Sequence, residues 1–163
     1  MRVALELGFE PDPDADDLTY VPLDDLAAGQ PDQPTGRDLG FEAGAVVIDP
    51  GTGQQARIQD ALRYAVSGLC LRSVPILVAG GSHTYRCFDS LAEVRLVVDG
   101  DTVLVSGQGV HPVVCPRAGL LDGFVAAGTR FLELMPRIMP GYEPYLDTVQ
   151  RELDEARDAL ARR

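Results

Sequence analysis

Two short segments of the chain carry the same arrangement of histidine and cysteine. His83 and Cys87 are four residues apart in the first segment, and His111 and Cys115 are four residues apart in the second. These are the only histidines of the chain, and Cys70 is its one further cysteine. Imidazole and thiolate groups bind structural zinc, and a thiol beside an imidazole is also the pair that cysteine nucleophiles use. The two segments are therefore the first place to look for chemistry.

The residues inside both segments favour strands, and strand geometry argues against a shared metal ion. They are mostly β-branched, aromatic or proline residues, which disfavour a helix. Residues four apart in a strand lie on one face but roughly 13 Å from each other, at ~3.3 Å per residue, whereas zinc binds its ligands at about 2.0–2.3 Å. We therefore expect no metal and no cofactor. An alternative ligand site or enzymatic site remains open on the sheet face that carries His83, Cys87, His111 and Cys115.

A glycine-rich turn offers a different chemistry, that of phosphate binding. Gly51 and Gly53 follow an apolar run at 45–48 and lie at the start of a pattern typical of a capped amphipathic helix, from Thr52 to Gly68. Glycines at such a place let a pyrophosphate approach the N-terminus of the helix. The acidic residue that would bind a ribose is missing from the strand expected next. Nucleotide binding at Gly51 and Gly53 stays an alternative, and a capped helix after a tight turn is the simpler interpretation.

The most acidic part of the chain is a proline-rich segment at about 10–37. Nine carboxylates and no basic residue lie between Arg2 and Arg37. The five prolines of the segment forbid long regular structure, so we predict a long loop. Such a loop is suited to a cationic partner, because exposed charges steer association. The residues we expect to meet that partner are Asp12, Asp14, Asp16, Asp17, Asp24 and Asp25.

Composition limits the remaining function classes. The chain has 163 residues and a net charge of −11, and a surface of that sign repels phosphate backbones and anionic lipid heads. We expect no nucleic acid and no membrane as partner. The first residues lack the apolar stretch of a secretory signal, and all fourteen basic residues are arginine, which is typical of a GC-rich bacterial genome. We therefore expect a cytoplasmic protein with free thiols.

The local patterns predict one α+β domain over residues 1–163. An Asp99-Gly100 pair between β-branched arms indicates a hairpin, and short strands joined by turns usually pair with their neighbours. The fold we predict is an antiparallel meander of about five to seven strands with two or three helices packed on one face. The expected strands are 2–7, 45–48, 74–79, 83–88, 93–98, 102–106 and 110–114. The expected late helices are 118–135 and an amphipathic C-terminal helix at about 143–161.

The apolar stripe of the C-terminal helix has two uses, as part of the core or as the interface of a homodimer. The stripe consists of Leu146, Val149, Leu153, Ala156 and Leu160. Small acidic proteins that bind and neutralise a partner, among them the immunity partners of bacterial toxins, share the overall character of this chain. Our leading hypothesis is thus a non-enzymatic, immunity- or inhibitor-type module that binds a basic protein through its acidic segment.

Overall fold

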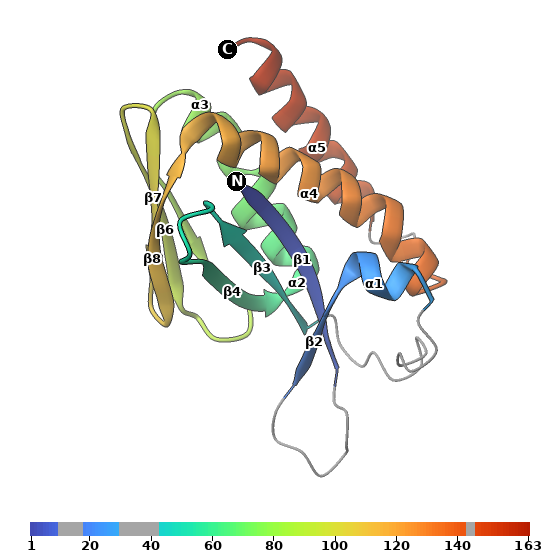
Figure 1. Ribbon diagram of the computed structural model, residues 1–163. Coiled ribbons are helices and arrows are strands. Elements are labelled where there is room, and N and C mark those ends of the chain that lie inside the picture. Colours follow the sequence, from blue (N-terminus) through green and yellow to red (C-terminus); the bar gives the residue numbers. More distant parts are fainter. Residues whose placement is uncertain (10–17, 30–42, 143–145) are drawn as a thin grey trace.

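The structure is a computed structural model that describes residues 1–9, 18–29, 43–142 and 146–163. In this part of the chain the strands form two antiparallel sheets of four strands each (Figure 1). The first sheet contains β1 (Arg2–Phe9), β2 (Thr19–Pro22), β3 (Ala43–Asp49) and β4 (Ala56–Ala61). The second sheet contains β5 (His83–Arg86), β6 (Glu93–Asp99), β7 (Thr102–Gly107) and β8 (Val110–Pro116). The helical segments are α1 (Leu23–Ala27), α2 (Leu62–Tyr64), the π-helical η1 (Ala65–Leu71), α3 (Ser73–Val78), α4 (Arg117–Ile138) and α5 (Leu146–Ala161).

The predicted α+β class is confirmed, but the single meander is wrong. The strand order of the first sheet is β2-β1-β3-β4, so β3 pairs with β1 and not with β2, which precedes it in the chain. Its central strand β3 has a run of buried residues from Gly44 to Ile48, which places this strand inside the molecule on both faces. Only the second sheet, in the order β5-β6-β7-β8, is the meander that short turns predict.

The second sheet follows its sequence pattern closely. Val94 and Leu96 of β6 are buried while Arg95 and Val97 are exposed, which is the alternation of a strand with one covered face. The predicted Asp-Gly hairpin is present, with Asp99 paired to Thr102. Gly100 has a φ of +56°, a value that favours glycine in tight hairpin turns.

The helix expected from Thr52 to Gly68 is wrong over its first half. Residues 56–61 are β4, which pairs with β3 as the second arm of a hairpin. Ala56, Ile58 and Asp60 are buried whereas Gln59 is exposed, so the two-residue period of a strand was the dominant signal. The Gly51 turn therefore joins two strands, and the helix N-terminus that would bind a pyrophosphate is not there.

The strand expected at 74–79 is also wrong, because this segment forms α3. Pro75 lies in the first turn of α3, where a missing N–H costs no intrahelical bond. Val74 and Leu77 are both fully buried, which fits the three-residue spacing of a helix face. Tertiary packing thus overrides the strand preference of a short β-branched run.

The acidic segment at 10–37 is not a continuous loop. Its described part contains β2, which pairs with β1, and the short helix α1. Residues 10–17 and 30–42 lie outside the described residues. The prediction of a loop is therefore wrong for 19–27.

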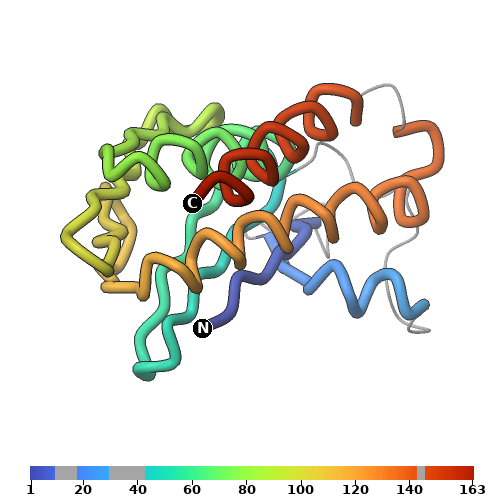
Figure 2. The backbone as a smooth tube through the Cα atoms, turned by 90° about the horizontal axis from the view of Figure 1, so that it is seen from above, coloured from blue at the N-terminus to red at the C-terminus, as the bar shows by residue number. Residues whose placement is uncertain are grey.

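The long helix α4 connects the two sheets, and the second long helix, α5, packs on α4. The helix α4 contacts β1 of the first sheet as well as β7 and β8 of the second, and Figures 1 and 2 show α5 running beside it. A Cβ atom on Gly128 would lie 2.7 Å from the Leu71 side chain, so glycine is what lets α4 approach η1 so closely. The helix predicted at 118–135 extends from Arg117 to Ile138, with Pro136 inside it. No helix in the described residues is long and apolar enough to cross a bilayer.

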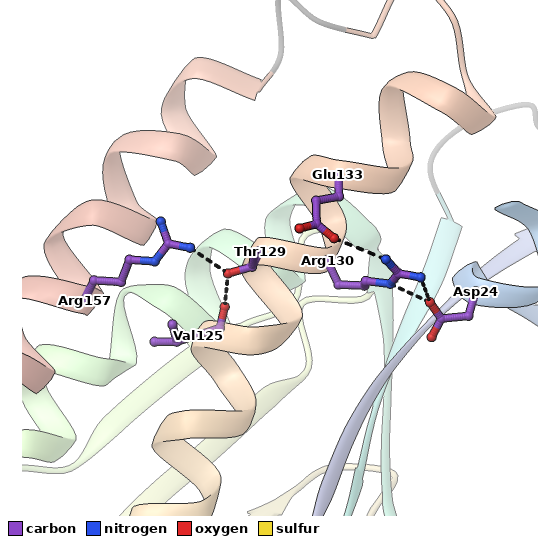
Figure 3. A network of polar contacts seen from close by, with 6 residues as sticks. All are labelled: Asp24, Val125, Thr129, Arg130, Glu133 and Arg157. Atoms are coloured by element: carbon purple, nitrogen blue, oxygen red, sulfur yellow. Dashed lines mark hydrogen bonds and ion pairs between the residues drawn. The ribbon is translucent and has the colours of Figure 1, made fainter.

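The C-terminal helix is present as α5, and its apolar stripe packs inside the chain. Val149, Leu153 and Ala156 are almost completely buried, and α5 contacts α3, α4 and η1. Arg157 adds a polar contact by donating a hydrogen bond to Thr129 Oγ1 at 3.0 Å (Figure 3). The centre of the stripe is therefore core.

Candidate ligand-binding cleft

A cleft of about 680 Å³ lies where η1, β5 and α5 meet. Cationic and aromatic groups dominate its lining, and none of its described lining residues is acidic. Thr148 and Val149, near the start of α5, also line the cleft. The groups that carry chemistry in the cleft are Arg63, Arg72, Arg86, His83, Tyr64, Tyr85 and Phe88.

The floor of the cleft depends on the π-helical segment η1. Such segments widen the helix locally and are frequent at functional sites. A Cβ atom on Gly68 would lie 2.6 Å from the ring of Tyr85, so only glycine lets β5 pack this close to η1. The carbonyl of Gly68 accepts a hydrogen bond from His83 Nε2 at 3.0 Å.

This contact defines the state of His83. Because a carbonyl only accepts hydrogen bonds, Nε2 must carry the proton, and Nδ1 is left as an acceptor. Partial burial lowers the pKa of His83 below its usual value, the Gly68 hydrogen bond opposes this shift, and the positive charge of Arg72 adds to it. His83 therefore contributes a neutral imidazole to the cleft at neutral pH.

A buried carboxylate fixes Arg72 at the edge of the cleft. Glu152 of α5 is 4% exposed, accepts a short hydrogen bond from Ser67 Oγ, and accepts a second bond from Arg72 Nε at 2.7 Å. Both carboxylate oxygens are thus occupied, which satisfies a buried charge. The Arg72 side chain itself is 60% exposed, so its remaining N–H donors reach the solvent.

Arg86 is the last residue of β5 and shares its acidic partner, Glu93, with Arg95. Glu93 lies 3.0 Å from Arg86 and 3.4 Å from Arg95. Hydrogen bonds from these two arginines lower the pKa of Glu93. One carboxylate therefore pairs with two guanidinium groups and balances only one of their two positive charges. Of these two arginines, Arg86 lines the cleft.

Two exposed aromatic rings stack at the mouth of the cleft. The ring centroids of Tyr64 and Phe88 are 4.6 Å apart and their planes differ by 12°. The guanidinium of Arg63 lies 4.8 Å from the Tyr64 ring centroid, as a cation–π contact. Tyr64 is 40% exposed and Phe88 is 62% exposed, which is unusual for rings of this size.

The loop that presents Phe88 is held by a buried carboxylate of the first sheet. Asp60 accepts a short hydrogen bond from the hydroxyl of Tyr85 and further bonds from the backbone N–H groups of Phe88 at 2.9 Å and Asp89 at 3.0 Å. Burial, followed by the hydrogen bond to Asp60, raises the pKa of Tyr85. This clamp fixes the position of the aromatic stack relative to β5.

The histidine and cysteine pairs of the sequence are distributed over the two edges of the second sheet. His83 and the adjoining Cys87 belong to the β5 edge, whereas His111 and Cys115 belong to β8 at the other edge. Only His83 lines the cleft. His111 is exposed, and in the described residues no cluster of three or more His, Cys, Asp or Glu side chains has the geometry of a metal site.

The three cysteines are buried and unpaired. Burial raises the pKa of Cys70 and Cys87, and raises that of Cys115 to about 11. A raised thiol pKa disfavours the thiolate that nucleophilic attack requires. These cysteines are thus suited to packing.

Of the six acidic residues expected to bind a partner, the structure describes Asp24 and Asp25, while Asp12, Asp14, Asp16 and Asp17 lie outside the described residues. Both described residues belong to α1 and are exposed. Asp24 accepts a hydrogen bond from Arg130 of α4 at 2.5 Å, and Arg130 also contacts Glu133 at 3.1 Å (Figure 3). One of the two carboxylates is therefore engaged within the chain.

Sequence reasoning missed every cleft residue except His83. A weak signal was available, because Arg63-Tyr64 and Arg86-Cys87-Phe88 each place an arginine close to an aromatic residue. The pairing of Tyr64 with Phe88 across 24 residues depends on the β3–β4 hairpin, which the sequence pattern did not reveal.

Comparisons of this chain with protein-family models, with curated proteins and with solved structures found no match.

Proposed function

We propose that this protein is a binding protein that holds a small anionic ligand in the cleft between η1, β5 and α5. The observation that supports the proposal is the composition of the lining, whose described residues include three arginines and no acidic residue, in a chain of net charge −11. Guanidinium groups match carboxylates and phosphates with paired N–H donors. A local excess of arginine in an acidic protein is the feature that needs a functional explanation.

The ion pairs around the cleft leave cationic donors for a ligand. Arg72 uses its Nε atom for Glu152 and remains largely exposed. Arg86 shares Glu93 with Arg95, so its own charge is only partly balanced. An anion between these two arginines would gain charge-assisted hydrogen bonds without breaking the buried Ser67–Glu152 contact.

The neutral His83 adds selectivity to this site. Its Nδ1 acceptor pairs with a donor such as a hydroxyl or an amide N–H, and not with a bare anionic oxygen. A ligand that carries a hydrogen-bond donor next to its anionic group therefore fits better than a simple inorganic ion.

Calorimetric titration with inorganic phosphate at constant ionic strength tests the proposal. The variant Arg86→Gln should weaken phosphate binding by about threefold to tenfold, since an exposed ion pair contributes up to ~1 kcal/mol and a paired contact somewhat more. Arg95→Gln is the matched control, because Arg95 contacts the same Glu93 but does not line the cleft. Equal losses in the two variants, or the absence of binding in the parent protein, would contradict the proposal.

Binding of a basic protein through the acidic segment is a second proposal, and the position of α1 supports it. The Arg130–Asp24 ion pair holds α1 against α4 and leaves Asp25 exposed beside it. Exchanging Asp12, Asp14, Asp16 and Asp17 for serine should slow association with a cationic partner protein and flatten its salt dependence. Unchanged association rates across a salt series would reject this role for the segment.

A further inference from the structure

We infer that the ligand of the cleft contains a flat aromatic ring next to its anionic group. This inference rests on the proposed function, because it concerns the same cleft and adds the class of molecule. It comes from the aromatic pair at the mouth, which anion binding alone does not require. Tyr64 and Phe88 both line the cleft and both remain substantially exposed.

The stack has an open position on Phe88. Tyr64 already has two planar neighbours, the Phe88 ring at 4.6 Å and the Arg63 guanidinium at 4.8 Å. Among the described residues, Tyr64 is the one aromatic ring that contacts Phe88, and Phe88 is 62% exposed. A third ring placed on Phe88 would continue the stack and cover apolar surface that now faces water.

The aromatic platform is positioned before any ligand arrives. Asp60 binds the backbone N–H groups of Phe88 and Asp89, and the Cys87 N–H donates a hydrogen bond to the Ala92 carbonyl at 2.8 Å, which closes the loop. A ring held by its own backbone loses little conformational freedom on binding, so more of the stacking energy is available to the ligand. Exposed rings on a fixed loop are typical of recognition surfaces.

The size of the cleft agrees with a ring-bearing molecule. Cavities that bind small organic ligands enclose roughly 300–1,000 Å³, and this cleft encloses about 680 Å³. Phosphate or acetate would contact the arginines and leave most of the volume to water. Arg86 and Phe88 are two residues apart and both line the cleft, so one molecule can place its anionic group on the first and its ring on the second.

Paired probes that differ only in the ring test the inference. Benzoate is compared with acetate, and adenosine 5′-monophosphate with ribose 5-phosphate, by titration at constant ionic strength. The ring should tighten binding by about twofold to tenfold in at least one of the pairs, as expected for one aromatic stacking contact. Which pair responds distinguishes an aromatic carboxylate from a nucleoside monophosphate as the source of the shared chemistry.

Variants at Phe88 and Leu91 test whether this gain in affinity comes from stacking on the Phe88 ring. Phe88→Ala should remove the gain, whereas Leu91→Ala should preserve it, because Leu91 is 73% exposed in the same loop but does not line the cleft. Phe88→Leu keeps the apolar bulk without the ring and should behave like Phe88→Ala. The circular dichroism spectrum verifies that each variant is folded.

Different results would contradict the anion-binding proposal and the inference of an aromatic ring. If the ring-free anions bind through Arg86 and the rings add nothing, or if Leu91→Ala removes the gain as fully as Phe88→Ala, the aromatic inference is overturned and the anion site stands. If none of the four probes binds, both proposals are overturned.

Discussion

Replacing Asp60 by asparagine should destabilise the protein although the two side chains have nearly the same shape. The Asp60 carboxylate accepts three hydrogen bonds, from the Tyr85 hydroxyl and the Phe88 N–H on Oδ2 and from the Asp89 N–H on Oδ1. Asparagine has one acceptor oxygen, so at least one donor would face its NH₂ group. The site is 4% exposed, which limits rescue by water.

The magnitude follows from these contacts. A hydrogen bond to a charged group contributes about 1.5–3 kcal/mol, against about 0.5–1.5 kcal/mol for a neutral one. Asp60→Asn loses one charge-assisted bond and weakens the other two, while it relieves the desolvation of a charge. Phe88 and Asp89 are themselves exposed, so water can bind their backbone N–H groups and compensate for part of the lost stability. We expect a net loss of about 2–3 kcal/mol in the free energy of unfolding.

Urea denaturation followed by circular dichroism measures this loss, and Asp101→Asn provides the control. Asp101 is exposed, so its exchange should change the unfolding free energy by less than ~0.5 kcal/mol. Combining Asp60→Asn with Tyr85→Phe should give a coupling energy of about 1 kcal/mol, because both changes act on the same Tyr85–Asp60 hydrogen bond. A loss below ~1 kcal/mol for Asp60→Asn, or additive effects in the double variant, would refute the clamp.

Three further changes test other parts of the structure. Leu153→Asp should unfold the protein, because Leu153 is 1% exposed and an unpaired charge there costs several kcal/mol, while exposed Arg151→Asp should leave the circular dichroism spectrum intact. Gly68→Ala should lower the unfolding free energy by about 1–3 kcal/mol in urea denaturation, because its Cβ atom would meet the Tyr85 ring. The lowered pKa of His83 means that its contribution to stability is complete above about pH 6.5 and is lost as the pH falls below that value, since the unfolded chain takes up the proton first. Urea midpoints measured against pH should therefore fall less steeply below 6.5 in His83→Gln than in the parent protein.

The parts of the fold that were predictable from sequence are those that local pattern determines. The Asp99-Gly100 turn and the alternation along 93–98 specify a hairpin without help from distant residues. The long helix at 118–135 and the stripe centred on Leu153 were recognisable for the same reason, because each repeats its apolar residues at helical spacing. For each of these elements, the residues that determine its structure lie close together in the sequence.

The predictions were wrong where contacts between residues that are distant in the sequence determine the secondary structure. Residues 56–61 follow a plausible helix cap, yet they pair with β3 because this completes the first sheet and buries Ile58. The run at 74–79 has strand character, yet its neighbours η1, α4 and α5 make it a buried helix. Sequence patterns describe the preference of a segment, and tertiary packing supplies energies large enough to reverse it.

The candidate cleft was hidden for a related reason. Its residues come from three separated segments, 63–72, 83–88 and 148–149, and no motif connects them. His83 attracted attention through its spacing from Cys87, but its position depends on the carbonyl of Gly68. Because the residues of this site are close only in the folded structure, their spacing along the sequence gives little sign of the site.

The proposed anion site lies in an acidic protein, and this has a consequence for the size of the ligand that it would bind. Carboxylates outnumber arginines by 25 to 14 in the chain, so a long polyanion that reached beyond the cleft would meet the negative remainder of the surface. Charges further away than the Debye length of about 8 Å at physiological ionic strength are largely screened, which leaves a small anion to interact mainly with Arg72 and Arg86. For the proposed anion site, this charge distribution therefore favours a compact anion that fits entirely within the cleft.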